Sequence, residues 1–192
     1  MDLQNIRAPI RVAMKSTTTG KGKLYADGCA NTGIAAIGNG MVEIYSTDRS
    51  VTLVGFDTFL SKKEITIGGA AGAIDLPTGP VIVQLNKVPF LHGATNLLLS
   101  STQAREFGVK VHDVAKRHRG KQMIQAGDKL IPLKLECALI YTPIWVPTQW
   151  ELNNTPRIVL TIQKPWDPTA LSEDMPSNAV YPRDVDMSSE DE

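Results

Sequence analysis

Short segments in which apolar and polar residues alternate follow one another along most of the chain, and glycine-containing turns separate them. The segments are residues 41–45, 50–56, 64–67 and 109–114. Residues 80–88 are predicted to form a further strand, because they are rich in β-branched residues. A two-residue period is typical of strands that bury one face, and the short spacing of the turns favours hairpins and meanders. The pattern predicts an all-β, mostly antiparallel, barrel-like domain over residues 20–145.

One stretch departs from the β pattern. Asn96 is a suitable N-cap, residues 97–107 suit a short helix, and Gly108 follows where a helix would stop. The apolar residues of this stretch do not share one helical face, so its first part is expected to be strand. We predict one short helix near Ser101 to Phe107.

A run of small residues from Gly68 to Ala73 lies between two predicted strands. Glycine clusters are typical of loops, because glycine adopts backbone conformations that other residues avoid. The run predicts either a mobile hairpin tip or an ordinary flexible loop. It is not a phosphate-binding loop, since no Gly-Lys-Ser/Thr follows it and the spacing of dinucleotide-binding glycines is absent.

The character of the sequence changes after residue 145. Frequent prolines disfavour long regular elements, although Arg157 to Ile162 suits one strand. This region also has three tryptophans, Trp145, Trp150 and Trp166, which either hold it against the domain surface or serve as anchors for a partner. From Pro165 onward the chain has eight acidic residues and one basic residue, a composition that favours disorder. The predicted organisation is an N-terminal segment and linker (1–19), the β domain (20–145), a proline-rich extension (146–164) and a disordered acidic tail (165–192).

Composition narrows the function classes. The 192 residues are 42% hydrophobic and 21% charged, with no net charge, which suits a folded domain and gives the whole molecule no attraction for nucleic acid or membranes. No run approaches the roughly 20 apolar residues of a membrane-spanning helix, and no signal peptide is visible. Cys29 and Cys137 are expected to be free thiols in the cytoplasm. Neither they nor the three histidines form a metal-binding pattern, and no cofactor is predicted.

The strongest basic cluster contains Lys116, Arg117, Arg119 and Lys121. Such a cluster can contact phosphates, but no aromatic residue is interleaved for base stacking. A solvated hairpin tip is the other interpretation, and charge runs usually decorate such turns. A weak, salt-sensitive contact with nucleic acid therefore stays a distant alternative.

The most distinctive stretch runs from Leu24 to Gly33. An apolar run carries Asp27 into a cluster of small residues, where Gly28 and Gly33 permit positive φ and close backbone approach. This pattern predicts a strand that enters a tight turn. An aspartate in such a turn accepts hydrogen bonds from neighbouring backbone N–H groups. Asp27 is therefore either a turn cap or a fixed carboxylate available for chemistry.

Two motifs in this order resemble a known family. Asp27-Gly28-Cys29-Ala30 is similar to the Asp-Thr/Ser-Gly-Ala turn of retroviral-type aspartic proteases, the retropepsins, and closer to the Asp-Gly-Gly-Ala-Asn variant of retrotransposon polyproteins. Residues 96–103, Asn-Leu-Leu-Leu-Ser-Ser-Thr-Gln, resemble the segment that closes the protease region of copia-type elements, and Gly108 to Val111 follow them. The resemblance covers residues 20–145 and implies a closed antiparallel β-barrel that cleaves polyprotein peptide bonds as a homodimer, without a cofactor.

The resemblance implies a role for each matched residue. Asp27 would be the catalytic carboxylate, one from each protomer across a two-fold axis. Gly28 and Ala30 would support the turn against a peptide substrate. The loop with Gly68, Gly69 and Gly72 would be the flap that covers the bound peptide.

Cys29 is the departure from the family pattern. The family has glycine at this place, and a β-carbon there would strain the turn or block the substrate. The alternative function is therefore an inactive descendant of the protease that keeps the fold and binds a peptide or a partner protein.

Overall fold

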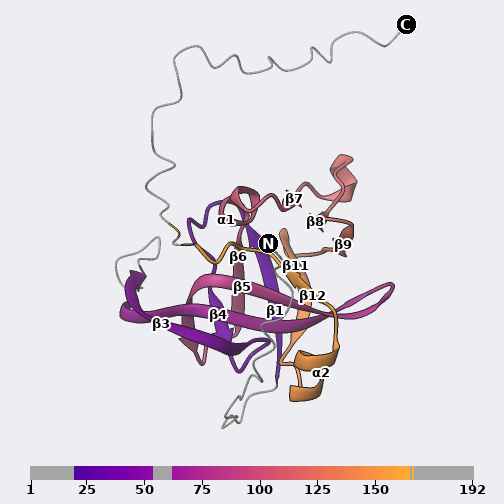
Figure 1. The fold of residues 1–192 in the computed structure, drawn as a ribbon. Coiled ribbons are helices and arrows are strands. Elements are labelled where there is room, and N and C mark those ends of the chain that lie inside the picture. The colour runs from indigo at the N-terminus through magenta and orange to yellow at the C-terminus, as the bar shows by residue number, and fades with distance from the viewer. Residues whose placement is uncertain (1–19, 54–61, 165, 167–192) are drawn as a thin grey trace, which may run out of the picture.

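The computed structural model describes residues 20–53, 62–164 and 166. These residues are mostly β-strand with two short α-helices, which confirms the all-β class (Figure 1). The N-terminal segment and linker predicted for residues 1–19 lie outside the described residues. So does the acidic tail predicted from residue 165, apart from Trp166.

The elements in chain order are β1 (Lys21–Asp27), β2 (Ala35–Ile37), β3 (Val42–Leu53), β4 (Lys62–Leu76), β5 (Gly79–His92), β6 (Asn96–Ser100), α1 (Ser101–Glu106), β7 (Lys110–His112), η2 (Lys116–His118), β8 (Met123–Ala126), β9 (Lys129–Pro132), β10 (Lys134–Glu136), β11 (Leu139–Trp145), α2 (Gln149–Asn154) and β12 (Arg157–Val159).

Most strands belong to one large sheet with the order β12-β5-β4-β11-β1-β6. Three further strands pair with members of this path without being part of it: β10 with β11, β2 with β5 and β3 with β4. A separate sheet has the order β7-β8-β9. Seven pairs are antiparallel, whereas β1–β6, β2–β5 and β12–β5 are parallel.

The closed barrel expected from the sequence is not found in the described residues. Closure requires the first and last strands of the sheet to pair, and here the path ends at β12 on one side and β6 on the other. Both end strands are short. β12 has three residues, and β6 has five before the chain turns directly into α1.

The β4–β5 hairpin forms the centre of the core, and both strands run through the middle of Figure 1. Residues 81–86 of β5 are buried one after another, as expected for a strand covered on both faces. The core also takes side chains from β1, β6 and β11. Among its fully or almost fully buried members are Leu24, Ile74, Leu85, Leu97, Leu99 and Ile144.

The small-residue run from Gly68 to Ala73 lies inside β4, so the loop predicted there is wrong. Its residues pair with β3 on one side and β5 on the other. A β-carbon on Gly69 would lie 2.1 Å from the ring of Tyr45, and one on Gly72 would lie 2.4 Å from the carbonyl oxygen of Gly40. Glycine is present because neighbouring groups approach the strand closely, not because the backbone must turn.

The strand-to-helix change expected in residues 96–107 is confirmed. β6 ends at Ser100, and this residue, rather than Asn96, is the N-cap of α1. Its hydroxyl oxygen accepts a hydrogen bond from the backbone N–H of Gln103 at 3.2 Å, which satisfies one of the unpaired N–H groups at the start of the helix.

Residues 146–164 continue the same folded unit. β12 adds to β5 in parallel, and the side chains of Leu152, Ile158 and Leu160 are buried. The boundary that the prolines suggested at residue 145 therefore divides elements of one domain, although the strand expected near Arg157 is confirmed. Helix α2 was not predicted. Its signal was the pair Thr148 and Glu151, which forms a capping box.

The close packing of β4 makes a testable prediction at Gly72. Gly72→Ala should lower the free energy of unfolding by about 1–3 kcal/mol, because the new methyl group meets the Gly40 backbone and the Ile144 side chain. Gly28→Ala is the matched control, since the atom nearest its added β-carbon is 3.8 Å away. Urea unfolding of the two variants and the wild type measures the difference. Equal stability of the Gly72 variant and the control would show that β4 is not packed in this way.

The capping box predicts a pH effect. The backbone N–H of Thr148 donates to the Glu151 carboxylate at 2.7 Å, and this bond lowers the pKa of Glu151 below its ordinary value. The Glu151 carboxylate therefore stabilises the folded state at any pH above its unfolded-state pKa, which is near 4.5. This stabilisation is lost as the pH falls through the lower pKa of the folded state. Glu151→Gln should therefore flatten the fall of the melting temperature between about pH 5 and pH 3. Glu106→Gln, at the end of α1, is the control and should keep the wild-type slope. A wild-type slope in the Glu151 variant would contradict the assignment.

Candidate functional site

Strand β1 delivers Asp27 to the edge of the core. The strand is held on both sides, antiparallel to β11 and parallel to β6, and Leu24 anchors it with 1% of its surface exposed. Asp27 is its last residue and is half-buried. The Asp27 Oδ1 atom accepts a hydrogen bond from the backbone N–H of Cys29 at 2.8 Å. The carboxylate is thus fixed by its own turn, and its exposed side remains available to a second molecule.

Strand β1 ends at Asp27 and the chain bends directly after it, as expected. None of Gly28, Cys29 and Gly33 has a positive φ, so the turn does not use the left-handed conformation that glycine permits. Gly33 is required by close approach, because a β-carbon there would lie 2.9 Å from the carbonyl oxygen of Leu98. Cys29 is exposed and has a φ that any residue adopts, so its β-carbon does not strain the turn.

The second motif lies directly beside the first. In the parallel pairing of β1 and β6, Asp27 is opposite Ser100. The Ser100 hydroxyl donates to the carbonyl oxygen of Ala30 at 2.6 Å while it accepts the α1 N–H, so one buried side chain joins the Asp27 turn to the start of the helix. Two short motifs that are about 70 residues apart in the sequence therefore meet in one hydrogen-bonded unit.

Gln103 fastens this unit to the central hairpin. Its side chain is completely buried; Oε1 accepts from the Gly33 N–H at 3.0 Å, and Nε2 donates to the carbonyls of Asn86 and Lys87 at 3.3 and 3.4 Å. Lys87 has φ 55° at an irregularity in the β4–β5 register, which turns its carbonyl away from the ladder. The position of the turn is thus set by α1 and β5 together.

A groove separates the turn segment from the β3–β4 hairpin. Its cavity volume is about 310 Å³. Asn31 and Thr32 form the end nearest the turn, and Asp27 lies outside the lining. The lining residues are Asn31, Thr32, Thr47, Arg49, Val51, Thr52, Leu53, Ile67, Lys87, Pro89 and Trp166.

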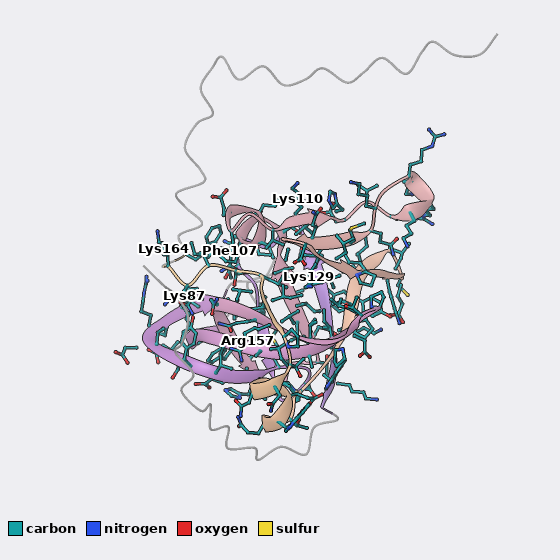
Figure 2. The ribbon with its side chains drawn as sticks, turned by 45° about the vertical axis from the view of Figure 1, so that its right-hand side comes forward. Lys87, Phe107, Lys110, Lys129, Arg157 and Lys164 are labelled. Atoms are coloured by element: carbon teal, nitrogen blue, oxygen red, sulfur yellow. The ribbon has the colours of Figure 1, made fainter. Side chains whose placement is uncertain are left out.

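The groove is lined by apolar side chains and by two cations. Its aliphatic walls come from β3, β4 and β5, and both ionisable side chains in the lining, Arg49 and Lys87, are cations. Figure 2 shows Lys87 on the same side of the molecule as Lys164, near the end of the described chain. Such a groove suits an extended peptide with an apolar side chain and a neighbouring acidic group.

The structure does not bring the glycines of β4 to this site. Gly68, Gly69 and Gly72 are buried inside the sheet, where β-carbons would collide with Tyr45, Phe90 and Ile144. Of the predicted substrate-binding residues, Gly28 and Ala30 lie in the Asp27 turn, Gly28 exposed and Ala30 half-buried. The substrate role expected of the β4 glycines depended on a loop, and the structure has a strand in its place.

The basic cluster forms the connection between β7 and β8. Lys116, Arg117, Arg119 and Lys121 are all exposed, and the two strands pair antiparallel, which confirms the hairpin interpretation. The Lys116 N–H is held by the side chain of Gln122 at 3.1 Å. The four basic side chains are therefore exposed to solvent at the tip of the β7–β8 hairpin.

Sequence reasoning missed the polar residues that build the site. Ser100 and Gln103 stood inside the quoted motif, but nothing local distinguished them from helix surface residues. Trp166 lies in the groove, where its indole Nε1–H donates to the carbonyl oxygen of Asn31 at 2.7 Å. The signal for Trp166 was a large aromatic residue at the start of an acidic, apolar-poor segment.

The two cysteines are both exposed and unbridged. Across residues 20–53, 62–164 and 166, no three His, Cys, Asp or Glu side chains gather as a metal site would require. In the same part of the chain, no helix has the length and apolar character needed to cross a membrane.

No protein-family model matches this chain, and no curated protein or solved structure is similar enough to count as a match. The resemblance to retroviral-type proteases therefore depends on the two short sequence motifs.

The junction at Gln103 makes a prediction about stability. Gln103→Ala should lower the free energy of unfolding by at least about 1–3 kcal/mol, because the buried N–H of Gly33 loses its acceptor. Gln125→Ala is the matched control. It removes a glutamine whose amide makes one long local bond to Gly127 at 3.4 Å, and it should change stability by less than about 0.5 kcal/mol. Urea unfolding with both variants decides the matter, and an equally small loss in both would contradict the role given to Gln103.

Proposed function

We propose that this chain is an aspartic endopeptidase of the retropepsin type, as found in copia-like retrotransposon polyproteins, and that it acts as a homodimer. The observation that carries the proposal is the junction of the two motifs. Asp27 is fixed at the end of β1, opposite Ser100, and Ser100 binds the Asp27 turn and caps α1. The same residues that resemble the family in sequence thus form one structural unit.

The chemistry follows from pairing two such turns. A two-fold axis would set Asp27 of one protomer beside Asp27 of its partner. Two adjacent carboxylates cannot both ionise, so they share one proton, as the paired carboxylates of aspartic proteases do in general. The ionised Asp27 takes a proton from a water molecule as that water attacks the scissile carbonyl carbon. The protonated Asp27 donates its proton to the carbonyl oxygen, which gives a tetrahedral intermediate with two hydroxyl groups. The proton taken from the water then passes to the amide nitrogen while the other carboxylate takes a hydroxyl proton, and the C–N bond breaks to give a carboxylic acid and an amine.

The turn geometry supports this role for Asp27. One carboxylate oxygen already accepts the Cys29 N–H at 2.8 Å, which keeps the side chain from rotating away. Ser100 holds the Ala30 carbonyl and Gln103 holds the Gly33 N–H, so both ends of the turn are tied to buried side chains. A carboxylate held in place before substrate arrives needs less reorganisation during the reaction.

The groove supports a peptide substrate. It runs from Asn31 and Thr32, within the segment that follows Asp27, along β3. Its aliphatic walls would take apolar side chains of an extended peptide, while the exposed Thr52 offers a hydroxyl group for polar contacts. In this proposal the β3–β4 hairpin takes the place of the flap, since it follows the turn in sequence and faces it across the groove.

A second candidate is a catalytically inactive fold that binds a peptide or protein. The exposed side chain of Cys29 favours it, because the family has glycine at this place and the extra sulfur lies only two residues from Asp27, in the turn that a dimer would pair. The absence of strain in the Cys29 backbone weighs against it, since the turn accommodates the side chain. The groove would serve binding in either case.

Asp27→Asn tests the first candidate. The variant should lose at least about 100-fold of the peptide-cleavage rate, the lower range of general acid–base contributions, without loss of stability, because asparagine keeps an oxygen acceptor for the Cys29 N–H. Wild-type cleavage should be fastest at acidic pH, and second order in protomer at low concentration.

Two variants complete this test. Asp113→Asn is the matched control: its carboxylate is 3.8 Å from the β-carbon position of Gly28 and pairs with Arg105, so cleavage should persist. Cys29→Gly restores the family residue and should raise cleavage or leave it unchanged. Cleavage by Cys29→Gly but not by the wild type identifies the inactive fold. Cleavage that survives Asp27→Asn ends the aspartic-protease proposal.

A further inference from the structure

The C-terminal segment of the chain reaches the groove by following β5. After β12, the Leu160 N–H donates to the Gln84 carbonyl at 2.9 Å, and the chain continues along β5. Figure 1 shows this orange segment above β5 in the view, running past the label of β6 to the place where the described chain ends. Trp166 is the last described residue, and it lines the groove beside the turn segment.

The course of this segment is fixed by buried contacts. Thr161 is completely buried, and its hydroxyl accepts from the Asn86 N–H at 2.6 Å and donates to the Asn86 carbonyl at 2.9 Å. The Asn86 side-chain amide in turn donates to the Thr161 carbonyl at 2.8 Å. These contacts fix the chain at Thr161 beside β5, and Trp166 lies at the groove five residues later.

Trp166 is held there by a specific bond. Its indole Nε1–H donates to the carbonyl oxygen of Asn31 at 2.7 Å, while its ring is half-buried among the lining residues. Trp150 gives the contrast, since it lies on the exposed face of α2 with 69% of its surface accessible. An indole that is both apolar and a hydrogen-bond donor matches this end of the groove.

The sequence beyond Trp166 complements the charge of the groove. Asp167 follows Trp166 directly, and residues 165–192 contain eight acidic residues and one basic residue. Both ionisable residues in the groove lining, Arg49 and Lys87, are cations. Because the segment is tethered, even weak ionic contacts act at a high effective concentration.

We propose that the groove is partly filled in cis: Trp166 lines its end beside the Asp27 turn, the acidic residues that follow are attracted by Arg49 and Lys87, and this C-terminal segment competes with any peptide that binds there. The groove then selects peptides with an aromatic side chain followed by acidic groups. That the competing peptide is a substrate rests on the proposed protease function, whereas the occupancy itself does not.

A binding experiment tests the proposal without cleavage. The probe is a fluorescein-labelled peptide copy of residues 162–174, and fluorescence anisotropy measures its affinity for the full chain in an Asp27→Asn background. Trp166→Ala should bind the peptide at least about 10-fold more tightly, because it removes the tethered competitor. Trp150→Ala is the matched control and should bind like its parent.

Two more measurements locate the contact. A peptide with alanine in place of its tryptophan should lose binding, and Arg49→Glu added to Trp166→Ala should weaken binding and reduce its salt dependence. Equal affinity of the parent and the Trp166 variant, or no binding by either, would overturn the proposal. Cleavage assays on the Asp27-containing chains separate the two proposals. Tighter peptide binding by the Trp166 variant without any cleavage contradicts the protease function but supports the role of the C-terminal segment. Cleavage without a change in peptide affinity supports the protease function but contradicts the role of the C-terminal segment.

Discussion

The hydrogen bonds of two buried amides, Asn86 and Gln103, join segments that lie far apart in the sequence. Both side chains are completely buried, and a buried amide without partners would cost free energy. The Asn86 Oδ1 atom accepts from the Tyr45 hydroxyl at 3.1 Å and from the Gln84 amide at 2.8 Å. Burial raises the pKa of Tyr45, so this hydroxyl keeps its proton and remains a donor. Because the partners come from several elements, the network forms only when β3, β5, α1 and the C-terminal segment are all in place.

This constraint explains how the candidate site is held. The network fixes α1 against β5, α1 fixes the Asp27 turn through Ser100, and Thr161 fixes the segment that carries Trp166. The walls of the groove, including Trp166, therefore depend on the same few polar groups. Networks of this kind rigidify a core only if every member is satisfied, and Asn86, Gln103 and Thr161 all have partners.

Local signals in the sequence predicted much of the fold, and contacts between distant residues decided what was missed. The β-branched composition of β5, the change from strand to helix at Ser100 and the basic hairpin tip were all predictable from neighbouring residues. The glycines of β4 were misread as a loop, because glycine marks both turns and close packing, and the packing partners Tyr45 and Ile144 are distant in sequence. The barrel expectation failed for the same reason, since closure depends on which end strands meet. The partner of Trp166 is 135 residues away, which no local pattern reveals.

The central claim is that an active site needs one Asp27 carboxylate from each of two chains. Mixing wild-type chain with Asp27→Asn, at a fixed total concentration well above that needed for dimers, tests it directly. The account predicts cleavage that falls as the square of the wild-type fraction, to about one quarter at an equal mixture, because only wild-type pairs carry both carboxylates. Cleavage that falls in direct proportion, to about one half, would show that each chain acts alone and would contradict the account.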